Sequence, residues 1–500
     1  MSINFIPNDP LADETGSAGA KSIAATPDRP AEHSGIFVTD LPAEAQYGVD
    51  TPEFVAWQAR EAALRAIVAF EEAYGSLPGW RGEEDARRLE LIPIAGDEFN
   101  AYYDRNAIAT YRFLVGGKPA YAGASTDVVA HETGHAILDA MRPDLWGVNM
   151  MEPSAFHEGF GDCVAIHTAL ADREIRQLLL AQGLDLRRAN FVEALAEQLS
   201  DAVRREIDPQ HNAASPRRAF NAFQWKFPAS LPVNGPPGSL INEEHSLGQI
   251  VSGVFYELIC GLFEASDQSE ASLHAASNRA MKLAARAAAK APLQPRFFES
   301  WGRSMAVVDR TEMNGEYQQL IKAAFSSHGI MVGSSNFLSP RVQLGGREGP
   351  TGEAGMRVSA DNRRLVRAAL DVEGSARLTA RPIEFGAQQV VELSAQREVQ
   401  LNGIDPRLEG VMSQVPRPAI VGRLDGSTAL LGVLDPGFTY DSEVRAFASS
   451  LTLRGAIDFG RSIPPGTGFV GGTGVATHRV ATERGRKVLK RKAFVCGCVH

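Results

Sequence analysis

The stretch DVVAHETGHAILD, residues 127–139, places two histidines four positions apart with a glutamate between them. Residues four apart in a helix lie on one face, with Cβ atoms about 5–6 Å apart. The imidazoles of His131 and His135 can therefore converge on one metal ion at about 2.0–2.1 Å. Glu132 is rotated to one side, where its carboxylate can take a proton from a water on the metal. The pattern predicts a zinc centre that supports chemistry.

A third ligand is expected, because a catalytic zinc ion usually has three protein ligands and keeps one position for water. AFHEGFGDCVAIHTAL begins another apolar helix and offers Glu158 for this role. Asp162 lies one turn later on the same face, where it can accept the second ring N–H of a ligating histidine. His157, next to Glu158, is predicted to pack against the site or orient it rather than to bind metal. A purely structural polar network is the alternative interpretation.

DVVAHETGHAILD followed by FHEGFGDCVA resembles the active-site helices of thermolysin-like zinc metallopeptidases, the glutamate-zincins. The second helix resembles the fungalysin branch of that group. The resemblance covers about residues 36–333 and implies that Glu132 is the general base and that Asp162 orients a ligand. It also implies a single zinc ion with three protein ligands, namely His131, His135 and Glu158.

The similarity extends to other parts of the substrate site. FNAYYD resembles the family's edge strand, which implies that Asn100 and Ala101 pair with the backbone of a peptide substrate. EEHSLGQIVSGVF resembles the start of the helix that carries the transition-state histidine, which implies His245. Arg218 in PRRAFN matches an arginine near the S1′ site. The implied fold is α+β, a zincin domain with a small N-terminal β/helix lobe and a helical C-terminal lobe.

The sequence also departs from the family pattern. No tyrosine lies between His135 and Glu158, so stabilisation of the oxyanion is expected to fall to His245. The acidic residues that bind calcium in the family have no match in HTALADREIRQLLLAQGLDLRR, so calcium is not expected. A secretory signal and a long inhibitory propeptide are missing too. We therefore expect a cytoplasmic location by default, with export only by a non-classical route.

Composition changes along the chain predict five segments. They are a flexible leader (1–35), the metallopeptidase domain (36–333), a linker (334–355), a β-rich accessory domain (356–460) and a basic, Gly-rich tail (461–500). A helix is predicted after Asp50-Thr51-Pro52, and hairpin turns are predicted at residues 104–106 and at Asn402-Gly403. The tail ends in Cys496, Cys498 and His500, too few ligands for a closed zinc site.

The bulk composition limits the class of protein. Apolar residues make up 44% and charged residues 22% of the chain, as in ordinary globular proteins. The net charge of -10 argues against nucleic acid as the main partner, and no apolar run is long enough for a transmembrane segment. We expect a zinc-dependent endopeptidase that acts on peptides or proteins. The alternatives are a zinc-stabilised binding or scaffold protein without activity and a delivered, toxin-like effector peptidase. No pattern indicates an oligomeric state.

Overall fold

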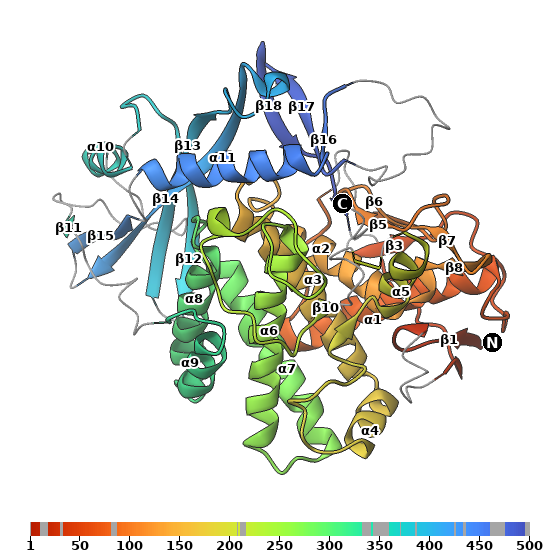
Figure 1. Ribbon diagram of the computed structural model, residues 1–500. Helices are drawn as coiled ribbons and strands as arrows, with labels where there is room; N and C mark the ends of the chain where they lie inside the picture. Colours follow the sequence, from red (N-terminus) through yellow and green to blue (C-terminus); the bar gives the residue numbers. More distant parts are fainter. Residues whose placement is uncertain are drawn as a thin grey trace.

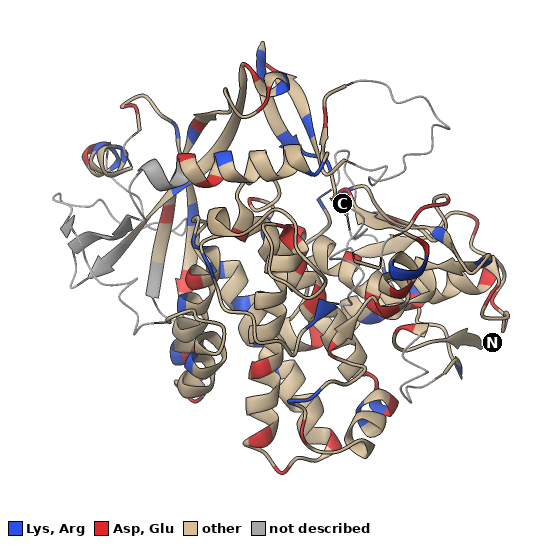
Figure 2. Ribbon diagram, viewed as in Figure 1, with Lys and Arg blue, Asp and Glu red and all other residues tan. Residues whose placement is uncertain are grey.

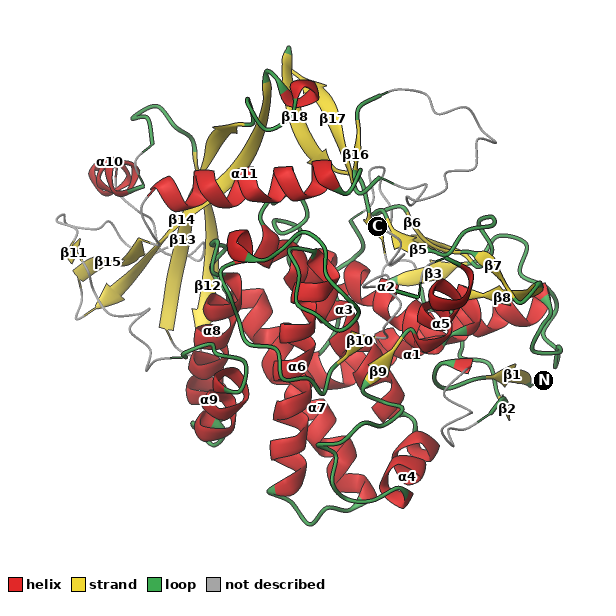
Figure 3. Cartoon of the chain, viewed as in Figure 1, coloured by secondary structure: helices red, strands yellow, loops and turns green. Residues whose placement is uncertain are grey.

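In the computed structural model a group of helices lies between two β-sheets (Figure 1), and helices outnumber strands around the centre (Figure 3). The fold class is therefore α+β, as predicted. The structure describes residues 2–10, 19–30, 34–81, 88–207, 209–210, 217–332, 342–343, 360–370, 372–385, 388–424, 427–433, 437–460 and 476–495.

The N-terminal sheet has five strands in the order β19, β5, β6, β4, β3. The strands are β3 (Gly35–Phe37), β4 (Arg88–Ile92), β5 (Ala101–Tyr103), β6 (Ala107–Thr110) and β19 (Phe494–Val495). β5 and β6 form the predicted hairpin, whose turn contains Arg105 with a φ of 77° and is held by the Asp104 carboxylate, which accepts the N–H of Ala107. β19 comes from the far end of the chain and pairs antiparallel with β5.

Most helices of the described residues lie within the first 330 positions, and the first two of them contact this sheet. Their bounds are α1 (Pro52–Tyr74), α2 (Thr126–Met141), α3 (Met151–Ala171), α4 (Arg173–Ala181), α5 (Glu197–Glu206), α6 (Glu244–Glu264), α7 (Glu270–Lys290), α8 (Phe297–Glu312) and α9 (Gln318–Ser326). The predicted start of α1 is confirmed, since Pro52 occupies its first turn and the Thr51 side chain accepts the N–H of Phe54. α3 packs against both α2 and α6 at the centre of the group.

Short two-stranded pairings complete the first part of the chain. These strands are β1 (Ile3–Phe5), β2 (Lys21–Ile23), β7 (Arg112–Val115), β8 (Lys118–Tyr121), β9 (Ala194–Leu195) and β10 (Arg217–Arg218). β1 and β2 correct the prediction of a flexible leader: they pair with each other, and Ile3 and Phe5 are buried. Their few apolar residues are spaced two apart, which is enough for a short strand to bury one face.

Within the described residues the C-terminal sheet has eight strands, and α10 (Ala360–Ala369) and α11 (Gly437–Leu453) accompany it. The strands are β11 (Val342–Gln343), β12 (Leu378–Phe385), β13 (Gln388–Gln400), β14 (Val411–Leu424), β15 (Ser427–Val433), β16 (Ile457–Asp458), β17 (His478–Glu483) and β18 (Arg486–Arg491). β13 and β14 flank the predicted Asn402-Gly403 turn, although their connection is longer than a tight hairpin and includes a 3₁₀ turn at Pro406–Leu408. Most of the predicted linker lies outside the described residues.

The predicted basic tail is part of this sheet rather than a solvated extension. β18 pairs with β17 and, in parallel, with β14 at Val411 and Met412. Val488 and Leu489 are both buried, so this strand is covered on both faces, whereas Lys487 is exposed. The Gly-rich part of the tail and the residues Cys496, Cys498 and His500 lie outside the described residues.

One hydrophobic core is shared by the two regions. The largest cluster of buried side chains includes Phe156 of α3 and also Phe447 of α11 and Leu489 of β18. Among the described helices, α6 alone is long and apolar enough to cross a membrane, and 83% of its most apolar window is buried within the protein. Burial of this kind is typical of a central core helix.

Candidate metal centre

Glycines bring the three helices of the site into close contact. A Cβ atom added to Gly134 of α2 would lie 2.8 Å from the Cα atom of Gly161 in α3. A Cβ atom added to Gly159 of α3 would overlap the carbonyl oxygen of Gly248 in α6. Gly134 costs about 1 kcal/mol relative to alanine inside a helix. Glycine is nevertheless required at this position, because no larger residue fits between α2 and α3.

Three histidine Nε2 atoms surround one carboxylate oxygen of Glu158. The distances to this oxygen are 3.2 Å from His131, 3.4 Å from His135 and 3.0 Å from His245. In a tetrahedral zinc site with bonds of about 2.0–2.1 Å, two ligand atoms lie about 3.3–3.4 Å apart. The spacings from Glu158 to His131 and His135 agree with this value, and all four side chains are buried. Two groups of side chains could hold a metal ion, namely His131, Glu158 and His245, and His131, Glu132 and His135.

Asp162 contacts one of the two histidines that were predicted to bind metal. Its Oδ1 lies 2.9 Å from Nδ1 of His131 and also accepts a hydrogen bond of 3.1 Å from the guanidinium of Arg217. Burial alone would raise the pKa of Asp162, but Arg217 and His131 hold it below its usual value. Asp162 therefore remains an anionic acceptor that fixes the orientation of the His131 ring.

The electrostatics of the cluster favour a cation. Burial lowers the pKa of His131, but hydrogen bonds to Asp162 and Glu158 more than compensate and raise it to about 9. Burial lowers the pKa of His135 to about 4, so this ring is neutral near pH 7 and keeps a lone pair on one nitrogen. The two carboxylates thus attract positive charge to a place where a neutral imidazole can coordinate it.

Glu132 lies beside the cluster with an unused carboxylate. Among the described residues neither of its oxygens has a hydrogen-bond partner, although the side chain is completely buried. Buried carboxylates in proteins are normally hydrogen-bonded, so such an exception calls for a functional explanation. Burial raises the pKa of Glu132 to about 8, which suits a group that gains and loses a proton near neutral pH.

His245 is fixed at the first turn of α6. Glu243 caps this helix by accepting the N–H of Ser246, and its other carboxylate oxygen lies 2.8 Å from Nδ1 of His245. The two neighbouring carboxylates, Glu158 and Glu243, outweigh burial and raise the pKa of His245 well above its usual value. The ring is therefore held as an N–H donor whose Nε2 side faces the cluster.

The residues that were predicted to bind substrate lie in two separate parts of the structure. Asn100 and Ala101 are both buried, and Ala101 begins β5, opposite Thr110 of β6. Arg218 does not reach the cluster, because its side chain pairs with the buried Glu193. Its neighbour Arg217 contacts Asp162 instead. Successive strand residues point to opposite sides, so only one of the two arginines of β10 can face the predicted metal ligands.

His157 was predicted to pack against the site, and Phe494 is a further side chain there that the sequence did not place. His157 lies with Nδ1 at 3.1 Å from Nδ1 of His135, and Phe494 of β19 stacks on both rings, with centroids 4.0 Å from His157 and 4.7 Å from His135. Phe494 and Val495 are residue types that favour strands, but no local pattern indicates that β5 is their partner.

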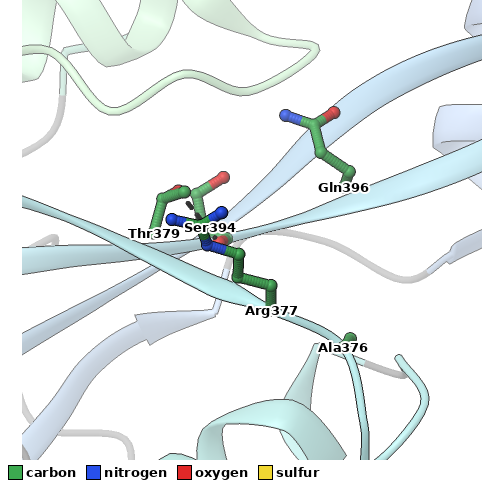
Figure 4. Close-up of a pocket in the computed structure, with 5 residues that line it drawn as sticks. All are labelled: Ala376, Arg377, Thr379, Ser394 and Gln396. Atoms are coloured by element: carbon green, nitrogen blue, oxygen red, sulfur yellow. Dashed lines mark hydrogen bonds between the residues drawn. The ribbon is translucent and has the colours of Figure 1, made fainter.

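The rest of the described chain offers no comparable cluster of metal-binding groups. The pocket in Figure 4, lined by Ala376, Arg377, Thr379, Ser394 and Gln396, belongs to β12 and β13 and contains no histidine or carboxylate. Acidic and basic residues are interspersed over the helices and strands (Figure 2). No known family model matches the sequence, and no curated protein matches it significantly.

Proposed function

We propose that this protein is a zinc-dependent metallopeptidase with a thermolysin-like catalytic domain. The observation that carries the proposal is the arrangement of His131 and His135 around one oxygen of Glu158 at tetrahedral spacing, with the unpaired Glu132 beside them. A structural ion does not require that extra carboxylate, whereas hydrolysis by an activated water does. The resemblance of both helices to those of glutamate-zincins supports the same conclusion.

The residues of the chain have separate tasks in the proposed reaction. Zinc held by His131, His135 and Glu158 would supply a Lewis acid and lower the pKa of water at the site. Glu132 accepts the proton of the attacking water and passes it to the nitrogen of the leaving amine.

His245 stabilises the negative charge that develops on the scissile carbonyl oxygen. Glu243 fixes its ring on the Nδ1 side, so the Nε2–H can be donated to the oxyanion without reorientation. The absence of a tyrosine between the two zinc helices leaves this donor as the proposed stabiliser. The β5 edge would hold a peptide as an additional strand.

The proposal is tested by comparing the wild type with Glu132→Gln, and with Glu53→Gln on the exposed side of α1 as a control. Zinc is quantified in each protein, and cleavage of a mixed library of unstructured peptides is measured with and without a chelator. We expect about one zinc ion in all three and a loss of cleavage of about 10²–10⁴-fold only in Glu132→Gln.

The assay should be repeated in a Phe494→Ala background, because Phe494 covers the site in the structure. Absence of zinc from the wild type would overturn the metal assignment. Zinc without cleavage in either background would instead support a binding protein that uses the ion for stability.

A further inference from the structure

The edge of β5 is occupied by the C-terminal segment of the same chain. Phe494 pairs with Tyr103 and Val495 with Tyr102 in antiparallel register, which makes β19 the outermost strand of the N-terminal sheet. An exposed strand edge offers unpaired N–H and C=O groups, and extended peptides bind to such edges by adding a strand. β19 therefore uses the backbone groups that a peptide ligand of β5 would need.

Phe494 also fills a pocket next to the metal-binding side chains. Its ring stacks at 18° on His135 and at 21° on His157, and Trp146 packs edge-on against it at 5.4 Å. The phenylalanine side chain is 1% exposed. The pocket walls are thus aromatic rings that match a flat apolar side chain, and one of those walls is a proposed zinc ligand.

Arg491 anchors the segment to the start of α6. Its guanidinium lies 4.0 Å from the centroid of Phe494 and donates hydrogen bonds of 2.7 Å to Ser154 and 2.9 Å to Glu244. Glu244 immediately precedes His245, and both Arg491 and Glu244 are buried. This buried ion pair links the end of β18 to the metal centre, so the position of β19 is specific rather than incidental.

We propose that the β5 edge and the aromatic pocket form a groove for an extended peptide with an aromatic side chain, and that residues 493–495 fill this groove as an intramolecular inhibitor. The inhibitory effect rests on the proposed function, whereas the binding of a peptide to the groove does not. The Phe494 ring lies directly against His135, so a peptide side chain could not stack on that ring while the segment is in place. Activation then requires displacement of the C-terminal segment.

Binding of a peptide in trans tests this arrangement without relying on catalysis. The probe is a fluorescent pentapeptide RKAFV, which copies residues 491–495, and the control probe is RKAAV. Full-length Phe494→Ala and Phe494→Glu are compared with the wild type and with Phe459→Ala, which removes an aromatic ring elsewhere in the C-terminal region. All proteins carry Glu132→Gln, so that the probe is not cut.

We expect both Phe494 variants to bind RKAFV about 10–100-fold more tightly than the wild type, since loss of the phenyl ring weakens the internal competitor by that factor. RKAAV should bind weakly to every protein, and Phe459→Ala should behave as the wild type. Equal binding of RKAFV to the wild type and to folded Phe494 variants overturns the proposal, as does no binding to any of them.

Folding is checked by circular dichroism. If Phe494→Glu does not fold, Phe494→Ala and Arg491→Gln provide the same comparison, because Arg491→Gln loosens the anchor and leaves the pocket intact. Peptide cleavage is then measured with Glu132 restored. Tighter RKAFV binding without cleavage supports the groove and refutes the peptidase function, whereas cleavage without any gain in binding refutes the groove alone.

Discussion

The central helices and the C-terminal sheet contribute to the same site by different physical means. In α2 and α3 the paired residues of the site are four positions apart, so helix geometry alone brings His131 next to His135 and Glu158 next to Asp162. β19 reaches the site only because β18 is paired with the C-terminal sheet and its chain then crosses to β5. The helices determine which chemistry is available, and the sheet determines whether the site is open.

Among the changes that test this comparison, a steric clash between α2 and α3 is expected to have the largest effect on stability and zinc binding. In Gly161→Ala the new Cβ atom would lie 2.8 Å from Nδ1 of His131, so the ring or the helix must move. We expect a loss of about 1–3 kcal/mol in the free energy of unfolding, together with weaker zinc binding. Both are measured, by urea unfolding and by competition with a chelator.

Gly147→Ala is the matched control, because a Cβ atom at Gly147 meets no other atom within 4 Å and this glycine lies in the loop between the same two helices. It should be neutral or slightly stabilising. Full zinc affinity in Gly161→Ala would show that the close approach of α2 and α3 is not needed to position His131.

A somewhat smaller effect is expected when the orientation of a ligand is disturbed without a clash. Asp162→Asn weakens the acceptor that fixes His131 and removes the negative charge opposite Arg217. Loss of such a partner typically lowers metal affinity by about 10–100-fold, or about 1.4–2.7 kcal/mol. The measurement is the dissociation constant for zinc, obtained by competition.

Asp139→Asn is a matched control within the same helix pair, since Asp139 is also buried and paired with an arginine, Arg105. It should lower stability and leave zinc affinity unchanged. Equal losses of zinc affinity in the two variants would mean that burial of charge, rather than orientation of His131, sets the metal affinity.

The sequence predicts the parts of the site whose geometry is local. The spacing of His131 and His135 identifies one face of one helix, and the separation of Glu158 and Asp162 does the same for the next. Glycines at the helix contacts are visible in HETGH and HEGFGD, but their role as contact points requires the packed structure. The hairpin turn at residues 104–106 is local as well, and it was predicted in its observed position.

The parts that were missed depend on pairing between distant segments. Nothing near Phe494 in the sequence indicates Tyr103 as its strand partner, so the segment was predicted to belong to a basic, Gly-rich tail. The first strand, β1, was missed because only three residues form it and their burial comes from tertiary contacts. The choice between Arg217 and Arg218 depends on strand register, which a single sequence does not determine.

The substitution with the smallest expected effect tests whether the central helices and the C-terminal sheet are one folding unit. The Ser450 hydroxyl of α11 donates a buried hydrogen bond of 2.7 Å to the carbonyl oxygen of Asn242, close to the start of α6. Ser450→Ala should reduce the free energy of unfolding by about 0.5–1.5 kcal/mol, because this bond between the regions is lost. In Thr452→Ala, the control, the lost hydroxyl bonds only to Ala448 within α11.

Urea unfolding of both variants is followed by far-UV circular dichroism and by release of zinc. Because the regions share one hydrophobic core, we expect one transition for both signals, shifted in Ser450→Ala more than in the control. If zinc release keeps its wild-type midpoint while a separate transition shifts, the C-terminal sheet unfolds on its own. In that case β19 could leave the β5 edge whenever the sheet opens, and closure of the site would depend on the stability of the sheet rather than on Phe494.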